Sequence, residues 1–503
     1  MLKTKLETIL LQEFAEKTKV KFGTSGIRGL NSHLTDKICY VYTLAFLHYL
    51  ENIKKLTPDQ TIIIAGDLRV NTDHILKVIQ GAIESKGLKV ENVGKIPTPA
   101  LANYCLHKKT AGLIVTGSHI PSNMNGIKFY KADGEILKSD EKAIMEQSIT
   151  IDRSLFDENH ALLQLSNNQL ETVPFAYHLY AERYLQFFST DALSKLKIGM
   201  YAHSSVALET LADIFQKLGA TIYVFGKTDT FHSIDTEALT KHEKDIAKKY
   251  IEEYKLDLIV STDGDGDRPM LTDEHGQWLR GDIIGMLTAL ILQANFVVTP
   301  YTSNSSVEYI RQFKEIYRTK IGSPYIIEKI NNLINDGKGR IIGYEANGGV
   351  LIGTDFYTEG KILKALPTRD SLISLLTIIT HAKKSKLTIS ELVQKHTRLY
   401  TESQSIHDIP SEQSHAFLAK LAHNIRKKDF FKIKASVEKT EVLDGLRIYY
   451  DNGEIIHLRP SGNASELRCY TEASTAERTK LLNEECIRLL KLQFSKKVEE
   501  DHS

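Results

Sequence analysis

The chain has 503 residues, of which 42% are hydrophobic and 25% charged, an ordinary balance for globular domains. A chain of this length exceeds what one hydrophobic core can organise, so roughly three or four domains are expected. Its 64 basic residues nearly cancel its 63 acidic ones, which excludes binding of nucleic acid or an anionic membrane through overall charge.

The cysteines and the apolar segments indicate in which cellular compartment the protein is expected. Four cysteines stand far apart without metal-ligand spacing, which is typical of a reducing compartment: Cys39, Cys105, Cys469 and Cys486. An apolar run near Ile9 is interrupted by Glu7 and Glu13, and no small-residue cleavage site follows it. The longest apolar segments, 283–292 and 372–379, are too short to span a bilayer. We therefore expect a cytoplasmic protein without a membrane partner.

The first residues predict a helix followed by a glycine-rich loop. Apolar and charged residues alternate at helical spacing over 4–19. The loop 22–29, Phe-Gly-Thr-Ser-Gly-Ile-Arg-Gly, would let an anion approach backbone N–H groups. It lacks the Gly-x-Gly-x-x-Gly pattern of a dinucleotide site, and on its own such a loop is more often a simple turn.

Strand, polar turn and helix then recur along the chain. Residues 61–65 predict a strand that ends at a polar turn over 66–69, and 73–86 predict a helix. The same succession returns at 198–218 and from 341 onward, which indicates repeated α/β units. The polar, irregular segment 152–169 is the first expected domain boundary.

The loop 116–128, Thr-Gly-Ser-His-Ile-Pro-Ser-Asn-Met-Asn-Gly-Ile-Lys, is the strongest candidate for chemistry. It follows a predicted strand over 111–115, so Ser118 and His119 lie where ligands collect in open α/β sheets. Its turn residues can bring Lys128 back toward Ser118. A serine hydrolase is disfavoured because the Gly-x-Ser-x-Gly elbow is absent, whereas a plain surface loop stays open.

An acidic loop follows the apolar run 256–260. Asp263, Asp265 and Asp267 alternate with glycine, and such oxygen ligands suit Mg²⁺ or Ca²⁺. Without a cation, these carboxylates would repel one another. An EF-hand is disfavoured because Arg268 stands where that loop needs glycine, Pro269 follows, and a strand rather than a helix leads in.

Residues 282–294 predict a helix and 296–299 a strand, and the turn 320–325 comes next. A further strand over 340–343 runs into the glycine-rich turn 344–350, which contains Glu345 and Asn347. A plain strand followed by a glycine-rich turn remains an alternative for this segment.

The last hundred residues have a different pattern. Strands over 445–450 and 454–458 flank Asp-Asn-Gly, a hairpin signal, and a third strand is expected over 467–470. Ser474 with Glu477 predicts a capping box for a helix to about residue 493. The loop 459–465 joins an arginine, a hydroxyl and a glycine, a combination that suits a phosphate dianion.

Taken together, five of these motifs occur in the order in which the α-D-phosphohexomutases have them, and the chain resembles that family across residues 22–472. The family includes phosphoglucomutase, phosphomannomutase and phosphoglucosamine mutase. The resemblance implies that Ser118 carries the transferable phosphate and also faces the metal. It further implies these catalytic and metal roles: Lys128 in proton transfer with His119 assisting, Arg28 and Arg268 beside the phosphoserine, and Asp263, Asp265 and Asp267 as metal ligands.

The resemblance also implies a substrate site. Its expected residues are Glu345, Asn347, Lys320 and Ser323 for the sugar, and Arg459, Ser461, Gly462 and Asn463 for the phosphate that is not transferred. Four positions depart from the family pattern: Ile120 and Asn347 replace an asparagine and a serine, and Asn463 and Ser465 replace a threonine and a proline. The histidine common shortly after Glu345 is also absent, which bears on substrate identity more than on activity.

The implied fold class is α/β, with three mixed α/β domains of similar topology and a smaller C-terminal α+β domain around a central cleft. We expect the domains at 1–160 for the phosphoserine loop, 170–278 for the metal, 279–397 for the sugar and 398–503 for the phosphate.

The implied activity is that of an isomerase, an intramolecular phosphotransferase acting on hexose 6-phosphate and hexose 1-phosphate. Mg²⁺ and a hexose 1,6-bisphosphate primer would serve it, and the protein would be a monomer or homodimer. Mannose phosphate is the first expected substrate, with phosphoglucomutase activity in addition, and nearby cations are expected to lower the pKa of Lys128. The alternatives are phosphoglucosamine mutase and a non-catalytic sugar-phosphate-binding regulator.

Overall fold

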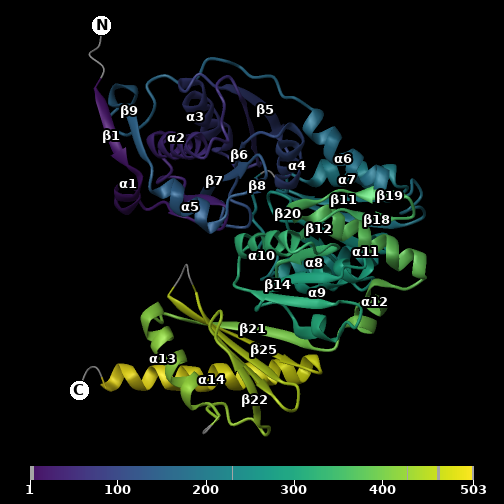
Figure 1. The fold of residues 1–503 in the computed structure, drawn as a ribbon. Helices are drawn as coiled ribbons and strands as arrows, with labels where there is room; N and C mark the ends of the chain where they lie inside the picture. Colours follow the sequence, from purple (N-terminus) through teal and green to yellow (C-terminus); the bar gives the residue numbers. More distant parts are fainter. Residues whose placement is uncertain (1–4, 229, 427–428, 462–464, 501–503) are drawn as a thin grey trace. The chain divides into compact units, whose positions relative to one another are not determined.

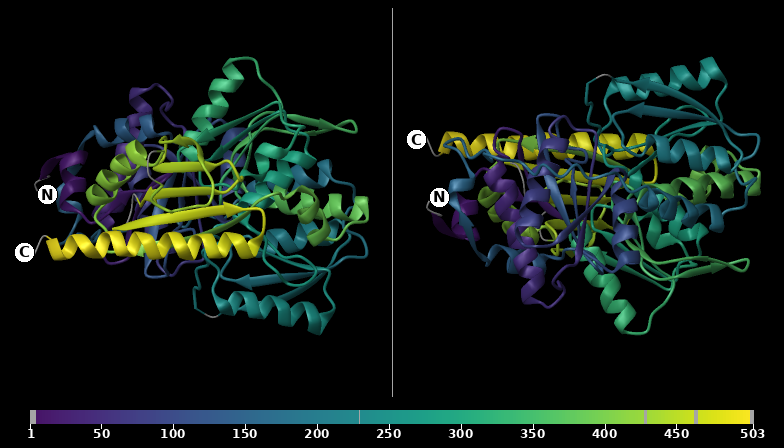
Figure 2. Two further views of the ribbon diagram at one scale, coloured as in Figure 1. Left: turned by 90° about the horizontal axis from the view of Figure 1, so that it is seen from below. Right: turned by 90° about the horizontal axis from the view of Figure 1, so that it is seen from above.

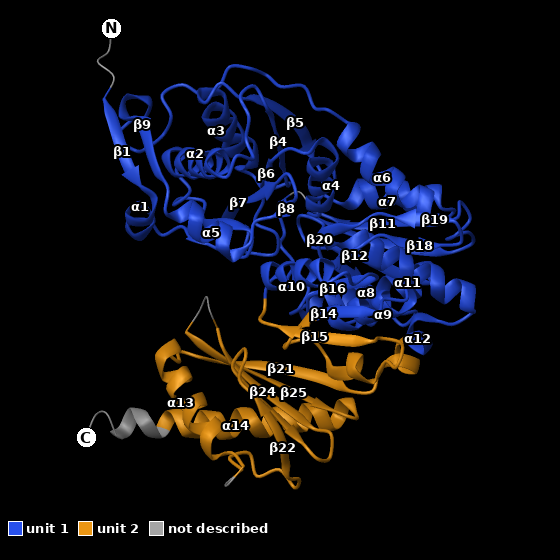
Figure 3. Ribbon diagram, in the orientation of Figure 1, with its two compact units in different colours: residues 1–298, 322–392 blue, residues 299–321, 393–503 orange. Residues whose placement is uncertain are grey.

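The computed structural model describes residues 5–228, 230–426, 429–461 and 465–500, the last five without their side chains (Figure 1). The chain forms two compact units (Figure 3). The first unit comprises 1–298 and 322–392, and the second comprises 299–321 and 393–503.

The chain begins with a strand rather than the predicted helix over 4–19. β1 (Leu6–Leu10) pairs antiparallel with β9 (Ser148–Asp152), and only α1 (Leu11–Lys17) is helical. The ladder to β9 satisfies the backbone of Leu6–Leu10, and this pairing outweighs the local helical pattern.

The first large sheet carries the loop that contains Ser118. Its strand order is β2-β3-β7-β6-β4-β5, with β8 paired to β7. The strands are β2 (Lys21–Phe22), β3 (Gly26–Leu30), β4 (Thr61–Gly66), β5 (Lys89–Lys95), β6 (Gly112–Val115), β7 (Met124–Lys131) and β8 (Gly134–Glu135). Its helices are α2 (Asp36–Asn52), α3 (Thr72–Ser85), α4 (Thr98–Lys108) and α5 (Lys138–Met145). β4, β5 and β6 are parallel, so the turns after β4 and β6 meet at one edge of the sheet.

The second sheet has the order β11-β10-β12-β13 and carries the acidic loop. Its strands are β10 (Lys197–His203), β11 (Thr221–Lys227), β12 (Leu258–Thr262) and β13 (Pro269–Leu271). The helices of this region are the short η1 (Arg153–Leu155), α6 (Phe175–Phe187), α7 (Leu208–Lys217) and α8 (Lys241–Tyr254). The acidic loop is the turn between the antiparallel strands β12 and β13, so it is approached by a strand as predicted.

The third sheet of the first unit contains β14 (Phe296–Pro300), β16 (Ile341–Tyr344), β17 (Val350–Ile352) and β20 (Leu366–Asp370). Between β17 and β20 in the chain, β18 (Phe356–Thr358) and β19 (Lys361–Leu363) form a separate hairpin. The helices of this region are α9 (Gly281–Ile291), α10 (Ser323–Asn335), α11 (Ser371–Ser385) and α12 (Ile389–His396). The two long apolar segments of the sequence lie in α9 and α11, which pack on each other. Among the described residues, no helix has the length and apolar character needed to cross a membrane.

The second unit contains an antiparallel sheet of order β21-β25-β24-β23-β22. Its elements are η2 (Ser305–Tyr309), β15 (Glu315–Thr319), β21 (Tyr400–His407), α13 (Ser411–Asn424), β22 (Val437–Glu441), β23 (Leu446–Tyr450), β24 (Ile455–Pro460), β25 (Glu466–Ala473) and α14 (Ala476–Glu500). Figure 2 shows α14 running along the sheet, where it contacts β21 and β25. The predicted hairpin and third strand are confirmed, whereas the hydroxyl that caps α14 belongs to Thr475, which accepts from Arg478 N at 3.2 Å.

Three sheets flanked by helices and a separate antiparallel sheet that packs with α13 and α14 confirm the predicted fold class. The four domain boundaries given above stay a prediction.

Candidate active site

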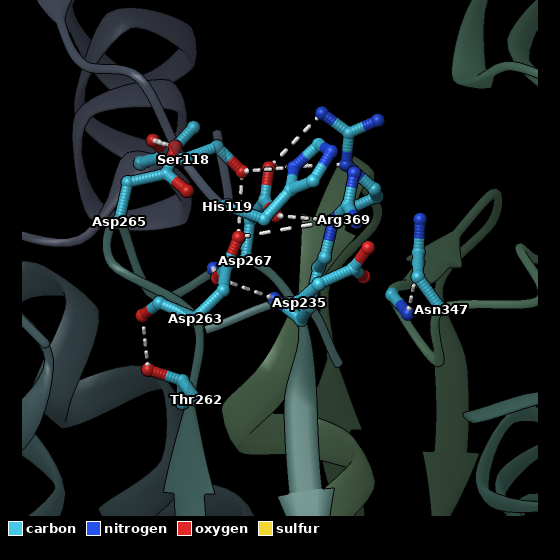
Figure 4. A network of polar contacts seen from close by, with 12 residues as sticks. Ser118, His119, Asp235, Thr262, Asp263, Asp265, Asp267, Asn347 and Arg369 are labelled. Atoms are coloured by element: carbon cyan, nitrogen blue, oxygen red, sulfur yellow. Dashed lines mark hydrogen bonds and ion pairs between the residues drawn. The ribbon is translucent and has the colours of Figure 1, made fainter. Parts of the chain in front are cut away.

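Ser118 lies in the loop between β6 and β7 in a left-handed backbone conformation, with φ of +54°. A residue other than glycine adopts this conformation at a cost of about 1–2 kcal/mol. The turn aims the hydroxyl at the acidic loop, where Oγ donates to Asp263 Oδ2 at 2.6 Å (Figure 4). A Cβ added at Gly264 would lie 2.8 Å from Ser118 O, so the close approach of the two loops requires glycine there.

Arg69, at the end of β4, holds the shape of the Ser118 loop. Its guanidinium donates to four loop carbonyls: Nη1 to Pro121 O and Met124 O, both at 2.7 Å, and Nη2 to Ser118 O at 3.0 Å and Ile120 O at 2.6 Å. Arg69 is buried, so these bonds are shielded from water. Sequence reasoning missed this residue, although its position in a polar turn at a strand end was a usable signal.

Asp67 lies in the same turn after β4 as Arg69 and also binds the Ser118 loop. Its carboxylate accepts from Thr116 Oγ1 at 2.7 Å and Thr72 Oγ1 at 3.0 Å, and its Oδ2 lies 3.4 Å from Arg69 Nε. Burial raises the pKa of Asp67, against the opposing charge of Arg69. The pair Asp67 and Arg69 therefore forms a buried frame around the predicted nucleophile.

The three aspartates of the acidic loop are fully buried, and their ligand atoms lie within 4.8 Å of one another. Burial, followed by the charges of Asp265 and Asp267, raises the pKa of Asp263 well above its usual value. Asp265 Oδ1 and Asp267 Oδ1 are buried without a hydrogen-bond partner among the described residues. Buried carboxylate oxygens that accept no hydrogen bond fit a hard divalent cation.

The predicted lowering of the Lys128 pKa is wrong. Lys128 Nζ donates to Asp265 Oδ2 at 2.6 Å and to Asp267 Oδ2 at 2.8 Å. Burial alone would lower the pKa of Lys128, but these two carboxylates outweigh it and raise the pKa. The expectation failed because the nearest charges to this ammonium are the aspartates rather than the neighbouring arginines.

The other predicted catalytic residues lie around Ser118 and the acidic loop. His119 Nδ1 lies 3.2 Å from Ser118 Oγ, and Arg268 Nε lies 3.7 Å from Asp263 Oδ2. Burial, followed by the charge of Arg268, lowers the pKa of Arg28 to about 10. Burial, and then the charges of these two arginines, lower the pKa of His119 well below its usual value, so His119 is neutral at neutral pH.

Glu345 and Asn347 follow β16, and both are buried. Arg369, at the end of β20, links Glu345 to the acidic loop: Nη1 donates to Glu345 Oε2 at 2.8 Å, and Nε donates to Asp267 Oδ2 at 3.0 Å. Sequence reasoning missed Arg369 because one arginine in a strand has no pattern of its own. The predicted Ser323 lies beside it, and its Oγ accepts from Arg369 Nη1 at 3.2 Å.

The remaining predicted substrate residues belong to the second unit. Arg459 Nε donates to both carboxylate oxygens of Asp444 at 3.1 Å, and Asp444 Oδ2 also accepts from Ile321 N at 3.1 Å. Ser461 is buried and Lys320 is exposed. Gly462 and Asn463 lie outside the described residues. Asp444 was not anticipated, and it fixes the guanidinium of Arg459 within this unit.

Comparison with known proteins decides the family. Four models of the phosphoglucomutase/phosphomannomutase family match in order: alpha/beta/alpha domain I at residues 19–154, domain II at 177–276, domain III at 280–400 and the C-terminal domain at 419–489. The chain belongs to this family. It is therefore a phosphohexomutase and an isomerase by class, as the resemblance implied.

Relatives in this family differ in the substrate that their names state. A phosphomannomutase of Salmonella muenchen is 40% identical, covering 92% of this chain and 93% of its own. A phosphomannomutase of Sinorhizobium fredii is 38% identical, covering 90% and 95%. A phosphoglucosamine mutase of Deinococcus deserti is 26% identical, covering 90% and 94%.

Solved structures share the fold. The crystal structure of a putative phosphomannomutase from Thermus thermophilus aligns with a TM-score of 0.73 at 21% identity, covering 94% of this chain and 99% of that one. The phosphoglucomutase parafusin of Paramecium aligns with a TM-score of 0.69 at 17% identity, covering 95% and 96%.

Proposed function

We propose that this member of the family interconverts mannose 6-phosphate and mannose 1-phosphate through a phosphoserine at Ser118 and a hexose 1,6-bisphosphate, and that it also accepts glucose phosphates. The contact of Ser118 Oγ with Asp263 Oδ2 at 2.6 Å carries the proposal. It brings the phosphate carrier to the acidic loop and, through that loop, to Lys128. The preference for mannose follows the names of the relatives at 40% and 38% identity.

Mg²⁺ is the proposed cofactor, held by Asp263, Asp265, Asp267 and the phosphate on Ser118. When bound, it supplies positive charge that offsets the roughly −1.5 to −2 charge of the phosphoserine. Carboxylate oxygens select hard cations over soft metals, and Asp265 Oδ1 and Asp267 Oδ1, which accept no hydrogen bond among the described residues, suit this role.

Phosphoryl transfer proceeds with one bond broken and one formed. The bond between phosphorus and Ser118 Oγ breaks as a sugar hydroxyl oxygen bonds to phosphorus. The neutral imidazole of His119 accepts the hydroxyl proton, and the Lys128 ammonium, whose pKa is raised, donates a proton to the departing Ser118 Oγ. Arg28 and Arg268 stabilise the charge on the phosphoryl group during transfer. The bisphosphate then reorients, its other phosphate returns to Ser118, and the product hydroxyl recovers a proton.

Recognition of the sugar and of the second phosphate is assigned to separate residues. Glu345 and Asn347 bind sugar hydroxyls, because a carboxylate and an amide supply both acceptors and a donor. The phosphate that is not transferred is bound by Arg459 and Ser461, with Gly462 and Asn463 in the same loop. Lys320 contacts the ligand directly, whereas Ser323 acts through its bond to Arg369.

The test is mutase activity with mannose 1-phosphate, glucose 1-phosphate and glucosamine 1-phosphate, in the presence of Mg²⁺ and a hexose bisphosphate primer. Ser118→Ala should abolish turnover, while Ser122→Ala, an exposed serine of the same loop, should keep it. Turnover by Ser118→Ala near the normal rate would overturn the assignment of the phosphate carrier. Absence of turnover on all three sugars, from protein shown to carry phosphate on Ser118, would favour the regulator.

A further inference from the structure

Arg369 occupies the space between the acidic loop and the predicted sugar-binding turn. Its guanidinium donates through Nε to Asp267 Oδ2 at 3.0 Å, and Nη2 forms an ion pair with the same oxygen at 3.0 Å. Nη1 donates to Glu345 Oε2 at 2.8 Å and to Ser323 Oγ at 3.2 Å. The residue is 3% exposed. A buried guanidinium with this many partners is held in one orientation (Figure 4).

The turn after β16 is shaped to admit this side chain. A Cβ added at Gly349 would lie 2.7 Å from both Cγ and Cδ of Arg369, so any larger residue there would displace the arginine. Gly349 N is in turn bound by Asn347 Oδ1 at 3.0 Å, which fixes the turn. Gly349 and Arg369 therefore act as a matched pair that places a cation beside Glu345.

This cation changes what Glu345 offers to a ligand. Glu345 Oε2 is taken by Arg369, while no hydrogen bond or ion pair engages Glu345 Oε1 in the part of the chain that the structure describes. The carboxylate can still accept hydrogen bonds from hydroxyl groups through Oε1. Its negative charge is already compensated, so it attracts an ammonium group only weakly.

We propose that Arg369 determines the substrate class of this site by favouring hexose phosphates with a neutral hydroxyl over those with a protonated amine. The inference rests on the proposed function, in which Glu345 contacts the sugar. An amino sugar would bring a positive charge into a buried region that contains the Arg369 guanidinium, and the two like charges repel. A neutral hydroxyl is not repelled by Arg369, and it can donate a hydrogen bond to Glu345 Oε1.

The test measures binding rather than turnover, so that it does not depend on catalysis. Calorimetric dissociation constants for mannose 1-phosphate and glucosamine 1-phosphate are compared in a Ser118→Ala background. That background should prefer mannose 1-phosphate, and adding Arg369→Gln should reduce the preference about tenfold. Arg369→Lys retains the charge and should retain the preference. An unchanged ratio in Arg369→Gln, or an equal loss in Arg369→Lys, would overturn the proposal.

Two further variants test whether a change in the ratio of dissociation constants is specific to Arg369 rather than a result of misfolding. Gly349→Ala displaces Arg369 without removing it and should also lower the ratio, and an unchanged ratio in this variant would contradict the proposal. Arg183→Gln is the matched control, because Arg183 Nε and Nη2 are buried without a hydrogen-bond partner among the described residues. It should leave the ratio unchanged, and a tenfold loss there would show that the effect is not specific to Arg369.

The outcomes separate this inference from the proposed function. If turnover of mannose phosphate depends on Ser118 but the ratio of the two dissociation constants does not change in Arg369→Gln, the mutase assignment stands and the role of Arg369 is rejected. If the ratio of the dissociation constants changes in Arg369→Gln but the protein turns over neither sugar phosphate, the mutase assignment is rejected and Arg369 remains the determinant of binding. A protein that binds neither sugar phosphate would overturn both.

Discussion

Ser118 Oγ lies 2.6 Å from Asp263 Oδ2, although 145 positions of sequence separate the two residues. Both sit at the carboxyl ends of buried strands, Ser118 after β6 and Asp263 after β12. The contact joins a hydroxyl that can carry a phosphate to three carboxylates that can bind a cation.

Removal of divalent metal should stop turnover, and Mg²⁺ should restore it. Lys128 offsets part of the charge of Asp265 and Asp267, but a phosphate on Ser118 would add about two negative charges beside Asp263 that a divalent cation would compensate. Activity is measured in chelator, after addition of excess Mg²⁺, and in Asp265→Asn, where a loss of at least about a hundredfold is expected. Full activity in excess chelator would exclude a metal role for the triad.

Replacement of Arg69 by methionine should destabilise the protein by about 3 kcal/mol and lower activity. The change leaves Asp67 buried without its countercharge and four loop carbonyls without their donor. The measurement is urea unfolding together with mutase activity. Arg311→Met, at an exposed position, is the control, and equal stability of the two variants would refute the framing role of Arg69.

Asp444→Asn should weaken binding of the sugar phosphate, with KM raised about tenfold and kcat less affected. Asp444 accepts from Arg459 Nε and from Ile321 N, so its loss frees the guanidinium that we propose binds the second phosphate. The kinetic constants are compared with those of Asp408→Asn, an exposed aspartate of the same unit. An unchanged KM would show that Arg459 does not depend on Asp444.

Stability of the second unit should fall on acidification because of His457. Burial, and then the charges of Arg447, Arg459 and Arg318, lower the pKa of His457 to about 3, while Nε2 donates to Asp444 O at 2.7 Å. The folded state thus binds fewer protons than the unfolded state below about pH 6.5, so the free energy of unfolding decreases as pH falls from 6.5 toward 3.

Between pH 7 and pH 5 this histidine accounts for up to about 2 kcal/mol of the loss. Unfolding midpoints at both pH values are measured for the parent chain and for His457→Leu. The difference between the two pH values should shrink in the variant, and a difference of the same size would contradict the assignment.

Local pattern was sufficient for several strands, for the motif loops and for their order, but not for β1, which is set by its pairing with β9. The turn after β6, the acidic turn after β12 and the hairpin between β23 and β24 are all determined by residues close in sequence. Arg69 and Arg369 were not found in this way, because apart from Asp67 beside Arg69 their partners lie more than twenty positions away and are mainly backbone carbonyls or single carboxylates. The sign of the Lys128 pKa shift failed for the same reason, since it depends on Asp265 and Asp267.

The most direct test of the account is the location of phosphate after incubation with hexose 1,6-bisphosphate. Mass spectrometry of the intact chain and its peptides should find one phosphate on Ser118, and added mannose 6-phosphate should remove it as mannose bisphosphate forms. Phosphate on any other residue, or none on Ser118 in a chain that turns over hexose phosphates, would contradict the central claim.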